Sequence, residues 1–182
     1  MAAEAPQAEI GFAAPAFTLP GTDGRPHTLA ELAGPRGTVV AFICNHCPYV
    51  KAILPRLVRD ARDLRQLGVH VIGISSNDAQ AYPEDSFARM VELSAGLPFP
   101  YLYDESQAVA RAYGAVCTPD FFGFDAGLKL RYRGRLDASR KETAPEGTRR
   151  DLYEAMQLIG ATGQGPAEQQ VAIGCSIKWR GG

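Results

Sequence analysis

Two cysteines separated by two residues stand where an apolar stretch gives way to an amphipathic one. Cys44 and Cys47 follow the apolar residues 39–43, and the step from Cys47 to Pro48 opens a helical pattern. The thiolate is the reactive form of cysteine, and the free N–H groups and partial positive charge of a helix N-terminus lower the pKa of a thiol placed there. The spacing therefore indicates a redox-active thiol pair.

The helix that would position this pair is visible in the residues after Pro48. Apolar side chains recur at steps of three and four residues as far as about Gly68, which is typical of one buried helix face. Pro48 suits the first helical position, because no intrahelical N–H is needed there. The pattern predicts a helix over residues 48–67 with Cys47 at its cap and Cys44 just outside it.

Two apolar runs flank this helix, at residues 38–43 and 69–74. Runs of this kind are typical of parallel strands that are covered on both faces. Strand, helix and strand in this order predict a right-handed βαβ unit. Residues 75–78 are polar and follow the second strand at the sheet edge where α/β proteins bind ligands, although Ser, Asn and Asp serve equally as loop and capping residues.

The whole pattern predicts an α/β fold in one domain. A chain of 182 residues with 46% hydrophobic and 21% charged content fits a single globular core. The other predicted elements are a hairpin from residues 16–19 and 26–29, a helix from Pro83 to about residue 95, a strand at 99–103, a helix through Tyr113 with Asp104 and Gln107 as its capping box, an antiparallel pair around a turn at 125–127, and a helix at 146–159.

Charge and targeting patterns restrict the compartment and the partners. The net charge of −1 argues against a nucleic-acid or membrane-binding surface, so we expect neither partner. The first nine residues lack the basic and apolar regions of a signal peptide, and four cysteines are too few for a stapled secreted scaffold. We therefore expect a cytoplasmic protein with a flexible arm at residues 1–10, a domain at 11–160 and a tail at 161–182 that carries Cys175.

The order of elements over residues 11–160 resembles a thioredoxin-like domain of the peroxiredoxin branch. Four stretches together are similar to the peroxiredoxin-like (redoxin, AhpC/TSA-type) proteins that carry a thioredoxin-style cysteine pair. These stretches are residues 42–50, 75–78, 117–120 and 174–179. The resemblance implies a mixed sheet of four or five strands with helices on both faces. It also implies that Thr118 and Pro119 form a cis-proline loop that packs against the pair and presents backbone to a bound thiol partner.

In a thioredoxin-style mechanism, Cys44 attacks a substrate disulfide and Cys47 resolves the mixed disulfide. His46 would then stabilise the Cys44 thiolate and make the pair more oxidising, unless it is only an exposed residue at the helix start. One feature departs from thioredoxin, because Thr38 stands where thioredoxin has a buried acid. The usual proton acceptor for the second thiol is therefore missing from the first strand.

In a peroxiredoxin-style mechanism, Cys47 is the peroxidatic residue, because peroxiredoxins carry it just before a proline such as Pro48. Their motif would require Pro at position 40 and Thr at position 44, where this chain has Val40 and Cys44. The hydroxyl that would orient a peroxide is replaced by a second thiol. That thiol could trap a sulfenate as a disulfide.

The other two cysteines leave alternatives open. Cys117 adjoins the Thr-Pro loop, where it is either a further redox residue or a buried inert thiol. Cys175 follows a stretch rich in Gly and Gln and is either a mobile resolving cysteine or an unreactive thiol in a docked tail.

Three functions are therefore compared. The first is a thiol-disulfide oxidoreductase that exchanges electrons with a protein or small-molecule disulfide and a thiol reductant, and the second is a thiol peroxidase. The third is a binding module without catalysis or with a metal held by Cys44, Cys47, His46 and Cys175. Zinc prefers four ligands in two spaced pairs, and the sequence has no second Cys-x-x-Cys or His pair. We expect no metal and no cofactor, and a redox enzyme of the first kind.

Overall fold

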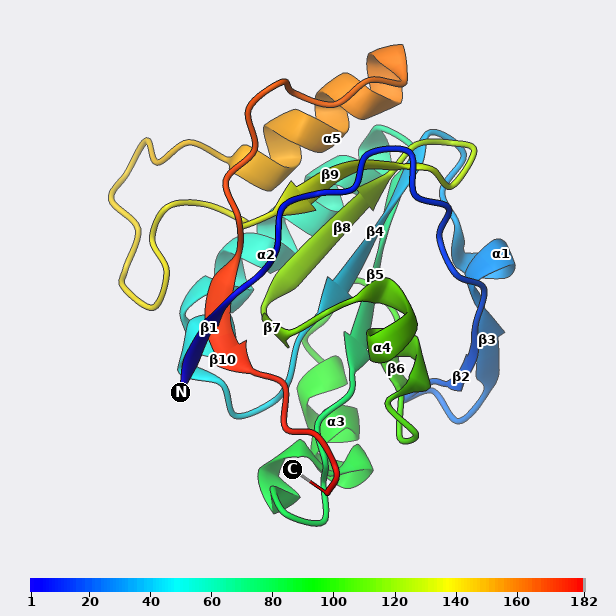
Figure 1. Cartoon of the computed structure of the whole chain (residues 1–182), viewed down its shortest axis with the longest axis vertical. Helices are drawn as coiled ribbons and strands as arrows, with labels where there is room; N and C mark the ends of the chain where they lie inside the picture. The colour runs from blue at the N-terminus through cyan, green and yellow to red at the C-terminus, as the bar shows by residue number, and fades with distance from the viewer. Residues whose placement is uncertain (182) are drawn as a thin grey trace.

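The computed structural model describes residues 1–181, and a five-stranded sheet lies at its centre (Figure 1). Strands β4, β5 and β6 are parallel to one another, whereas β8 runs antiparallel to β4 and β9 runs antiparallel to β8. The order across the sheet is β6-β5-β4-β8-β9. The bounds are β4 Gly37–Phe42, β5 Val69–Ser75, β6 Tyr101–Tyr103, β8 Asp120–Phe124 and β9 Leu130–Gly134. The predicted mixed sheet is confirmed.

Helices cover both faces of this sheet, as Figure 1 shows. One face packs against α2 (Pro48–Gln66), α3 (Phe87–Ser94) and α5 (Asp151–Thr162). The other face packs against α1 (Leu29–Leu32) and α4 (Ala108–Tyr113). Alternate residues of β4 point to opposite faces, so all six of its residues are buried. The predicted βαβ unit is therefore β4, α2 and β5, and it holds the cysteine pair at the junction of β4 and α2.

The predicted hairpin before the first strand is also present. Strands β2 (Thr18–Pro20) and β3 (Pro26–Thr28) pair antiparallel. Leu19 of β2 and the flanking Phe17 and Leu29 belong to the core cluster that covers the α4 face of the central sheet. None of the helices within residues 1–181 combines the length and the apolar character that a membrane span requires.

Two helix starts differ from the sequence-based prediction. The helix expected from Pro83 is split into a 3-10 turn, η1 (Pro83–Asp85), and α3, because the Ser86 hydroxyl accepts a hydrogen bond from Arg89 N and starts a new helix. Helix α5 begins at Asp151 rather than at residue 146.

The predicted capping box at the start of α4 is wrong. Gln107 has a φ of 65° and precedes the helix, while Asp104 accepts hydrogen bonds from the backbone N–H groups of Val109 and Ala110. The Gln107 side chain donates instead to the carbonyl oxygens of Ser76 and Lys178. The Gln107 side chain therefore binds the C-terminal segment instead of capping α4.

Both ends of the chain meet in a small second sheet of order β1-β10-β7. Strand β10 (Ile173–Ser176) pairs antiparallel with β1 (Ala2–Glu4) on one side and with β7 (Cys117–Thr118) on the other. Figure 1 shows β1 and β10 side by side. The segments predicted as a flexible arm and tail therefore contain strands that their composition did not predict, and the proposed division into arm, domain and tail stays a prediction.

Candidate active site

Cys47 occupies the N-cap position of α2, and Pro48 is the first helical residue. The backbone of Cys47 is extended, with φ −65° and ψ 124°, as expected for a residue that precedes proline. Its side chain makes no capping hydrogen bond, although its carbonyl oxygen accepts from Lys51 N at 2.9 Å. The predicted position of Cys47 at the helix cap is therefore confirmed, with Cys44 in the turn before it.

Thr118 brings the two thiols together from the opposite side. The Cys44 Sγ lies 3.5 Å from the Thr118 hydroxyl oxygen, and the Cys47 Sγ lies 3.4 Å from the Thr118 carbonyl oxygen. The bond between Thr118 and Pro119 is cis, as the resemblance implies. The predicted Thr-Pro loop thus packs directly against the pair.

Neither sulfur of the pair is open to solvent. Cys44 and Cys47 are both 0% exposed, whereas Cys175 on β10 is partly exposed. A folded partner protein therefore has no direct access to the pair in this conformation.

The charge of the pair resides on Cys47. Hydrogen bonds from the Cys44 thiol, the Cys175 thiol and the Thr118 hydroxyl lower the pKa of Cys47, although burial opposes this shift. The pKa of Cys44 is raised, because this thiol donates to Cys47, is buried and lies near the negative charge of Asp85. Ionisation of Cys47 rather than Cys44 is the arrangement that a peroxiredoxin-style mechanism requires, and it is the reverse of the thioredoxin-style assignment.

The ordinary pKa of a cysteine thiol is 9.0. Because the pKa of Cys47 is lowered, the reduced chain should carry a thiolate at pH values well below 9.0. We expect the ultraviolet absorbance of thiolate to rise in a separate step at acidic pH, and we expect Cys47→Ser to lack this step. Cys44 should stay protonated over the neutral range, because its pKa is shifted upward. A single transition near pH 9.0 in both proteins would contradict the assignment.

A buried carboxylate that the sequence analysis missed lies beside Cys44. Asp85 is 0% exposed and accepts hydrogen bonds from Asn45 N at 2.8 Å, His46 N at 3.3 Å and the Asn77 amide at 2.8 Å. The His46 Nδ1 lies 2.5 Å from Asp85 Oδ2, and the His46 ring stacks on Tyr82 with 5.7 Å between the ring centroids. The site thus contains an acid, but η1 supplies it rather than the first strand.

Three side chains of this region could hold a metal ion. Ligand atoms of Cys44, His46 and Asp85 all lie within 4.8 Å of one another. A thiolate, an imidazole and a carboxylate are all ligands that zinc accepts, with a fourth position left for water. This set differs from the one considered from the sequence, because it includes Asp85 and excludes Cys47 and Cys175.

The polar residues after β5 serve the structure and the tail. The Asn77 side chain accepts from Lys178 N at 2.9 Å, and Asp78 N donates to Lys178 O at 2.8 Å. The Ser76 hydroxyl donates to Asp104 at 2.8 Å. Of the two alternatives for residues 75–78, the structural role is the one that these contacts favour.

Cys117 and Cys175 differ in their surroundings. Cys117 is 0% exposed and burial raises its pKa, which fits the inert alternative. Cys175 lies in β10, opposite Thr118, and packs against the core cluster that contains Cys44 and Cys47. Of the two alternatives for Cys175, the structure has the docked tail, but with the thiol at the active site.

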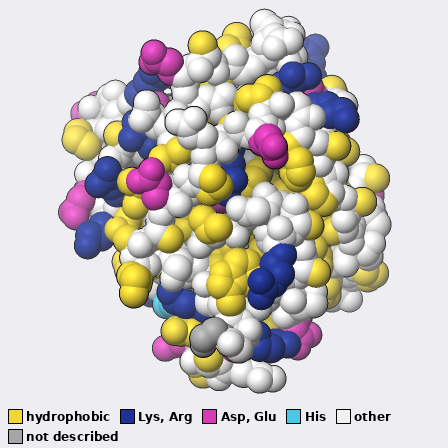
Figure 2. Space-filling view, viewed as in Figure 1, with side chains coloured by type: hydrophobic (Ala, Val, Ile, Leu, Met, Phe, Trp, Pro, Cys, Tyr) yellow, Lys and Arg dark blue, Asp and Glu magenta, His cyan; other side chains and the backbone are white. Residues whose placement is uncertain are grey.

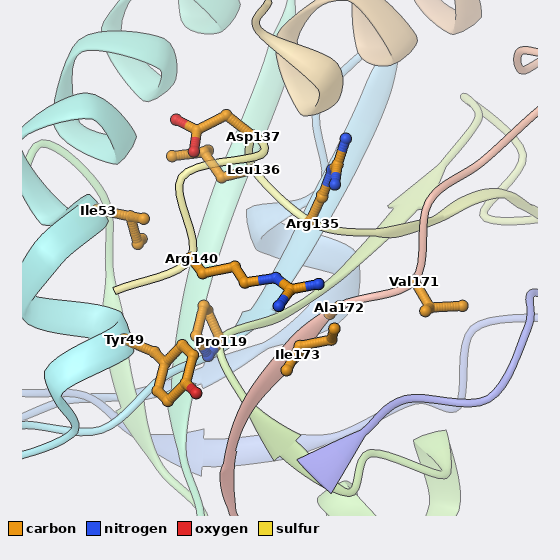
Figure 3. Close-up of a pocket in the computed structure, with 10 residues that line it drawn as sticks. All are labelled: Tyr49, Ile53, Pro119, Arg135, Leu136, Asp137, Arg140, Val171, Ala172 and Ile173. Atoms are coloured by element: carbon orange, nitrogen blue, oxygen red, sulfur yellow. The ribbon is translucent and has the colours of Figure 1, made fainter. Parts of the chain in front are cut away.

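A pocket adjoins the cis-proline loop at Pro119 (Figure 3). Its walls come from α2, through Tyr49 and Ile53, from Pro119 and the loop with Arg140, and from residues 171–173 of the tail. In Figure 3 the Arg140 side chain extends across the pocket toward the tail. Figure 2 shows that hydrophobic side chains also gather over the C-terminal segment, next to Lys or Arg.

A mixed five-stranded sheet, a Cys-x-x-Cys at a helix N-terminus and a facing cis-proline define the thioredoxin-like class. Residues 10–133 match the model of the AhpC/TSA family, and the chain belongs to this family. A provisionally named peroxiredoxin of Mycobacterium tuberculosis is 32% identical over 120 residues, which are 62% of this chain and 68% of that protein.

Two solved structures match along nearly the whole chain. An uncharacterised conserved protein from Geobacillus kaustophilus is 44% identical, with a TM-score of 0.94 and coverage of 100% of this chain and 98% of that chain. A hypothetical protein from Sinorhizobium meliloti 1021 is 40% identical, with a TM-score of 0.93 and coverage of 98% and 99%.

A more distant solved structure has the same fold. The thioredoxin domain of a Bacteroides vulgatus thiol-disulfide oxidoreductase is 21% identical, with a TM-score of 0.58 and coverage of 81% and 94%. The predicted thioredoxin-like fold is confirmed, and with the family it makes the chain a thiol-dependent redox enzyme.

Proposed function

We propose that this enzyme is a thiol-disulfide oxidoreductase in which Cys44 and Cys47 cycle between a dithiol and a disulfide. The observation that carries the proposal is the contact of both sulfurs with Thr118 at the N-terminus of α2. Two thiols that are held against the same residue at a helix N-terminus are placed to form a disulfide with each other. The partners are a disulfide substrate and a thiol reductant, and a cytoplasmic location stays a prediction.

Cys47 is the attacking residue in this cycle. Its thiolate attacks one sulfur of the substrate disulfide, and the other sulfur leaves as a thiolate and takes up a proton. Cys44 then loses its proton, attacks Cys47 Sγ and expels the second half of the substrate. Cys44 can act only after Cys47 has reacted, because the thiolate of Cys47 is the main cause of the raised pKa of Cys44. Once Cys47 is in a mixed disulfide, Cys44 ionises more readily.

The test is a thiol-trapped, non-reducing peptide map of the pure protein across a glutathione redox series. We expect a Cys44–Cys47 disulfide with a potential above the roughly −270 mV of thioredoxin, because a stabilised thiolate favours the reduced state. Thiols that stay reduced throughout the series, or that become protected by added zinc, would instead support a binding module.

Reduction of peroxide is a second candidate, and the burial of the pair favours it. Hydrogen peroxide is small enough to reach a sulfur that a folded protein cannot contact, and relatives of the chain carry the name peroxiredoxin. The Cys47 thiolate would attack one peroxide oxygen, and the other oxygen would leave as water after taking up a proton. Cys44 would then attack the sulfenic acid on Cys47, release a second water and form the same disulfide.

The two candidates are separated by the rate of disulfide formation. Faster formation of the Cys44–Cys47 bond with hydrogen peroxide than with oxidised glutathione, at equal concentrations, would favour the peroxidase. The absence of the family's Thr at the position of Cys44 favours the opposite order.

A further inference from the structure

The C-terminal strand covers the backbone that precedes the cis-proline. In β10, Cys175 is opposite Thr118 and Ser176 is opposite Cys117, in an antiparallel pair. Thr118 is also the residue that contacts both sulfurs of the pair. The chain therefore places a cysteine of its own on the edge where the resemblance expects the backbone of a thiol partner.

Gly174 makes this placement possible. A Cβ atom at residue 174 would lie 1.9 Å from the Thr118 carbonyl oxygen and 3.1 Å from Pro119 N. Only glycine allows β10 to approach the loop so closely. The contact therefore depends on a specific residue next to Cys175.

Hydrogen bonds beyond β10 hold this strand in place. Gln107 binds the tail twice, since its amide donates to Lys178 O at 2.8 Å and its side-chain oxygen accepts from Arg180 N at 2.9 Å. Ile177 is buried, and its N–H donates to Val116 O at 3.0 Å. Cys175 is thus held between the buried pair and solvent rather than on a free end.

We propose that Cys175 is a third redox residue, which exchanges disulfides with Cys47 and carries oxidising equivalents from the buried pair to a dithiol reductant at the surface. The inference rests on the proposed function, because it needs a Cys44–Cys47 disulfide as its starting point. Cys175 suits the role because it lies opposite Thr118, whose carbonyl oxygen is 3.4 Å from the Cys47 sulfur, and because it is partly exposed whereas Cys44 and Cys47 are buried.

The relay has two steps. Cys175 gives up its proton and attacks Cys47 Sγ, so that a Cys47–Cys175 bond forms while Cys44 leaves as a thiolate and takes up a proton. A thiolate of the dithiol reductant then attacks Cys175 Sγ, and Cys47 leaves as a thiolate. The second thiol of the reductant closes its own disulfide and releases Cys175, so that two electrons have passed to the chain.

The ionisation of the thiols supports this direction. Burial and the neighbouring Cys47 thiolate raise the pKa of Cys175 to about 11 in the dithiol form. A Cys44–Cys47 disulfide removes that thiolate, so Cys175 becomes a better nucleophile in the oxidised chain. In the second step, the low pKa of Cys47 makes it the better leaving group.

The first test traps the proposed bond. Full-length Cys44→Ser is oxidised with hydrogen peroxide or oxidised glutathione, quenched with a thiol-blocking reagent and mapped under non-reducing conditions. We expect a Cys47–Cys175 disulfide in the variant, and the same bond as a transient species when wild type is mapped at early times. In Cys175→Ser, we expect dithiothreitol to reduce the Cys44–Cys47 bond about tenfold more slowly than in wild type.

A second variant moves the strand without removing a thiol. Gly174→Ala should lower the yield of the Cys47–Cys175 bond, because its Cβ cannot fit against Thr118. Gly96→Ala is the matched control, since the nearest atom to its Cβ is 3.9 Å away. Cys117→Ala controls for the loss of a neighbouring thiol and should leave the bond pattern unchanged.

Three outcomes decide the question. A Cys47–Cys175 bond in Cys44→Ser and in early wild-type samples supports the relay. A wild-type Cys44–Cys47 bond with no Cys175 disulfide in either protein overturns the relay and leaves the proposed function intact. A wild type in which no disulfide forms at all removes both.

Discussion

Replacing Cys47 by serine is expected to abolish disulfide exchange, with a loss of turnover on the order of 1,000-fold or more. Cys47 is the thiolate of the reduced site and the partner common to both proposed disulfides. A serine hydroxyl at the same position is neither ionised at neutral pH nor able to form a disulfide. Turnover of oxidised glutathione, followed through consumption of the thiol reductant, measures the loss.

The matched comparison is Cys44→Ser, which removes a thiol three positions earlier. This variant should keep residual turnover, because Cys175 can still resolve a mixed disulfide on Cys47. The reverse ranking, with Cys44→Ser inactive and Cys47→Ser accumulating a mixed disulfide on Cys44, would restore the thioredoxin-style assignment. Cys117→Ala should behave as wild type in either case.

The part of the site that could be predicted from the sequence is the part built by neighbouring residues. The run at residues 38–43, the proline after Cys47 and the periodicity to residue 67 are local signals, and they correctly predicted β4, α2 and the position of the pair between them. Thr118 and Pro119 are distant in sequence. Their place beside the pair was predicted only through the family resemblance.

The remaining features depend on contacts between distant segments. Asp85 looked like an ordinary acidic residue at a helix start, and nothing near it in the sequence indicates that Asn45, His46 and Asn77 surround it. Residues 173–176 are too short and too mixed to be predicted as a strand. The close approach of Gly174 to Thr118 appears only when both segments are in place.

These distant contacts also explain how one site can protect a thiolate and still exchange electrons. Helix α2 and the Thr118 loop bury Cys44 and Cys47 completely, which keeps large oxidants away from the reactive sulfur. Strand β10 completes this enclosure with a thiol of its own rather than with an inert side chain. A dithiol reductant can then reach the oxidised pair by disulfide exchange at Cys175, without opening the enclosure.

Removal of the Asp85 carboxylate should destabilise the fold around Cys44. In Asp85→Ala, the N–H groups of Asn45 and His46 and the amide of Asn77 lose their acceptor in a buried place. A buried donor left without a partner costs about 1–3 kcal/mol, so we expect the free energy of unfolding to fall by about 3 kcal/mol after some rearrangement. Urea unfolding of the reduced proteins measures this change.

The neighbouring Glu84→Ala provides the control, because the Glu84 side chain is exposed and its removal should change the free energy of unfolding by less than about 0.5 kcal/mol.

A conservative variant separates the electrostatic role of Asp85 from its structural one. Asp85→Asn keeps the size of the side chain but removes the negative charge that helps to raise the pKa of Cys44. In this variant the Cys44 thiol should ionise at lower pH than in wild type, whereas Glu84→Ala should leave its titration unchanged. Equal stability of Asp85→Ala and Glu84→Ala, with an unshifted Cys44 in Asp85→Asn, would show that Asp85 neither supports the site nor controls its second thiol.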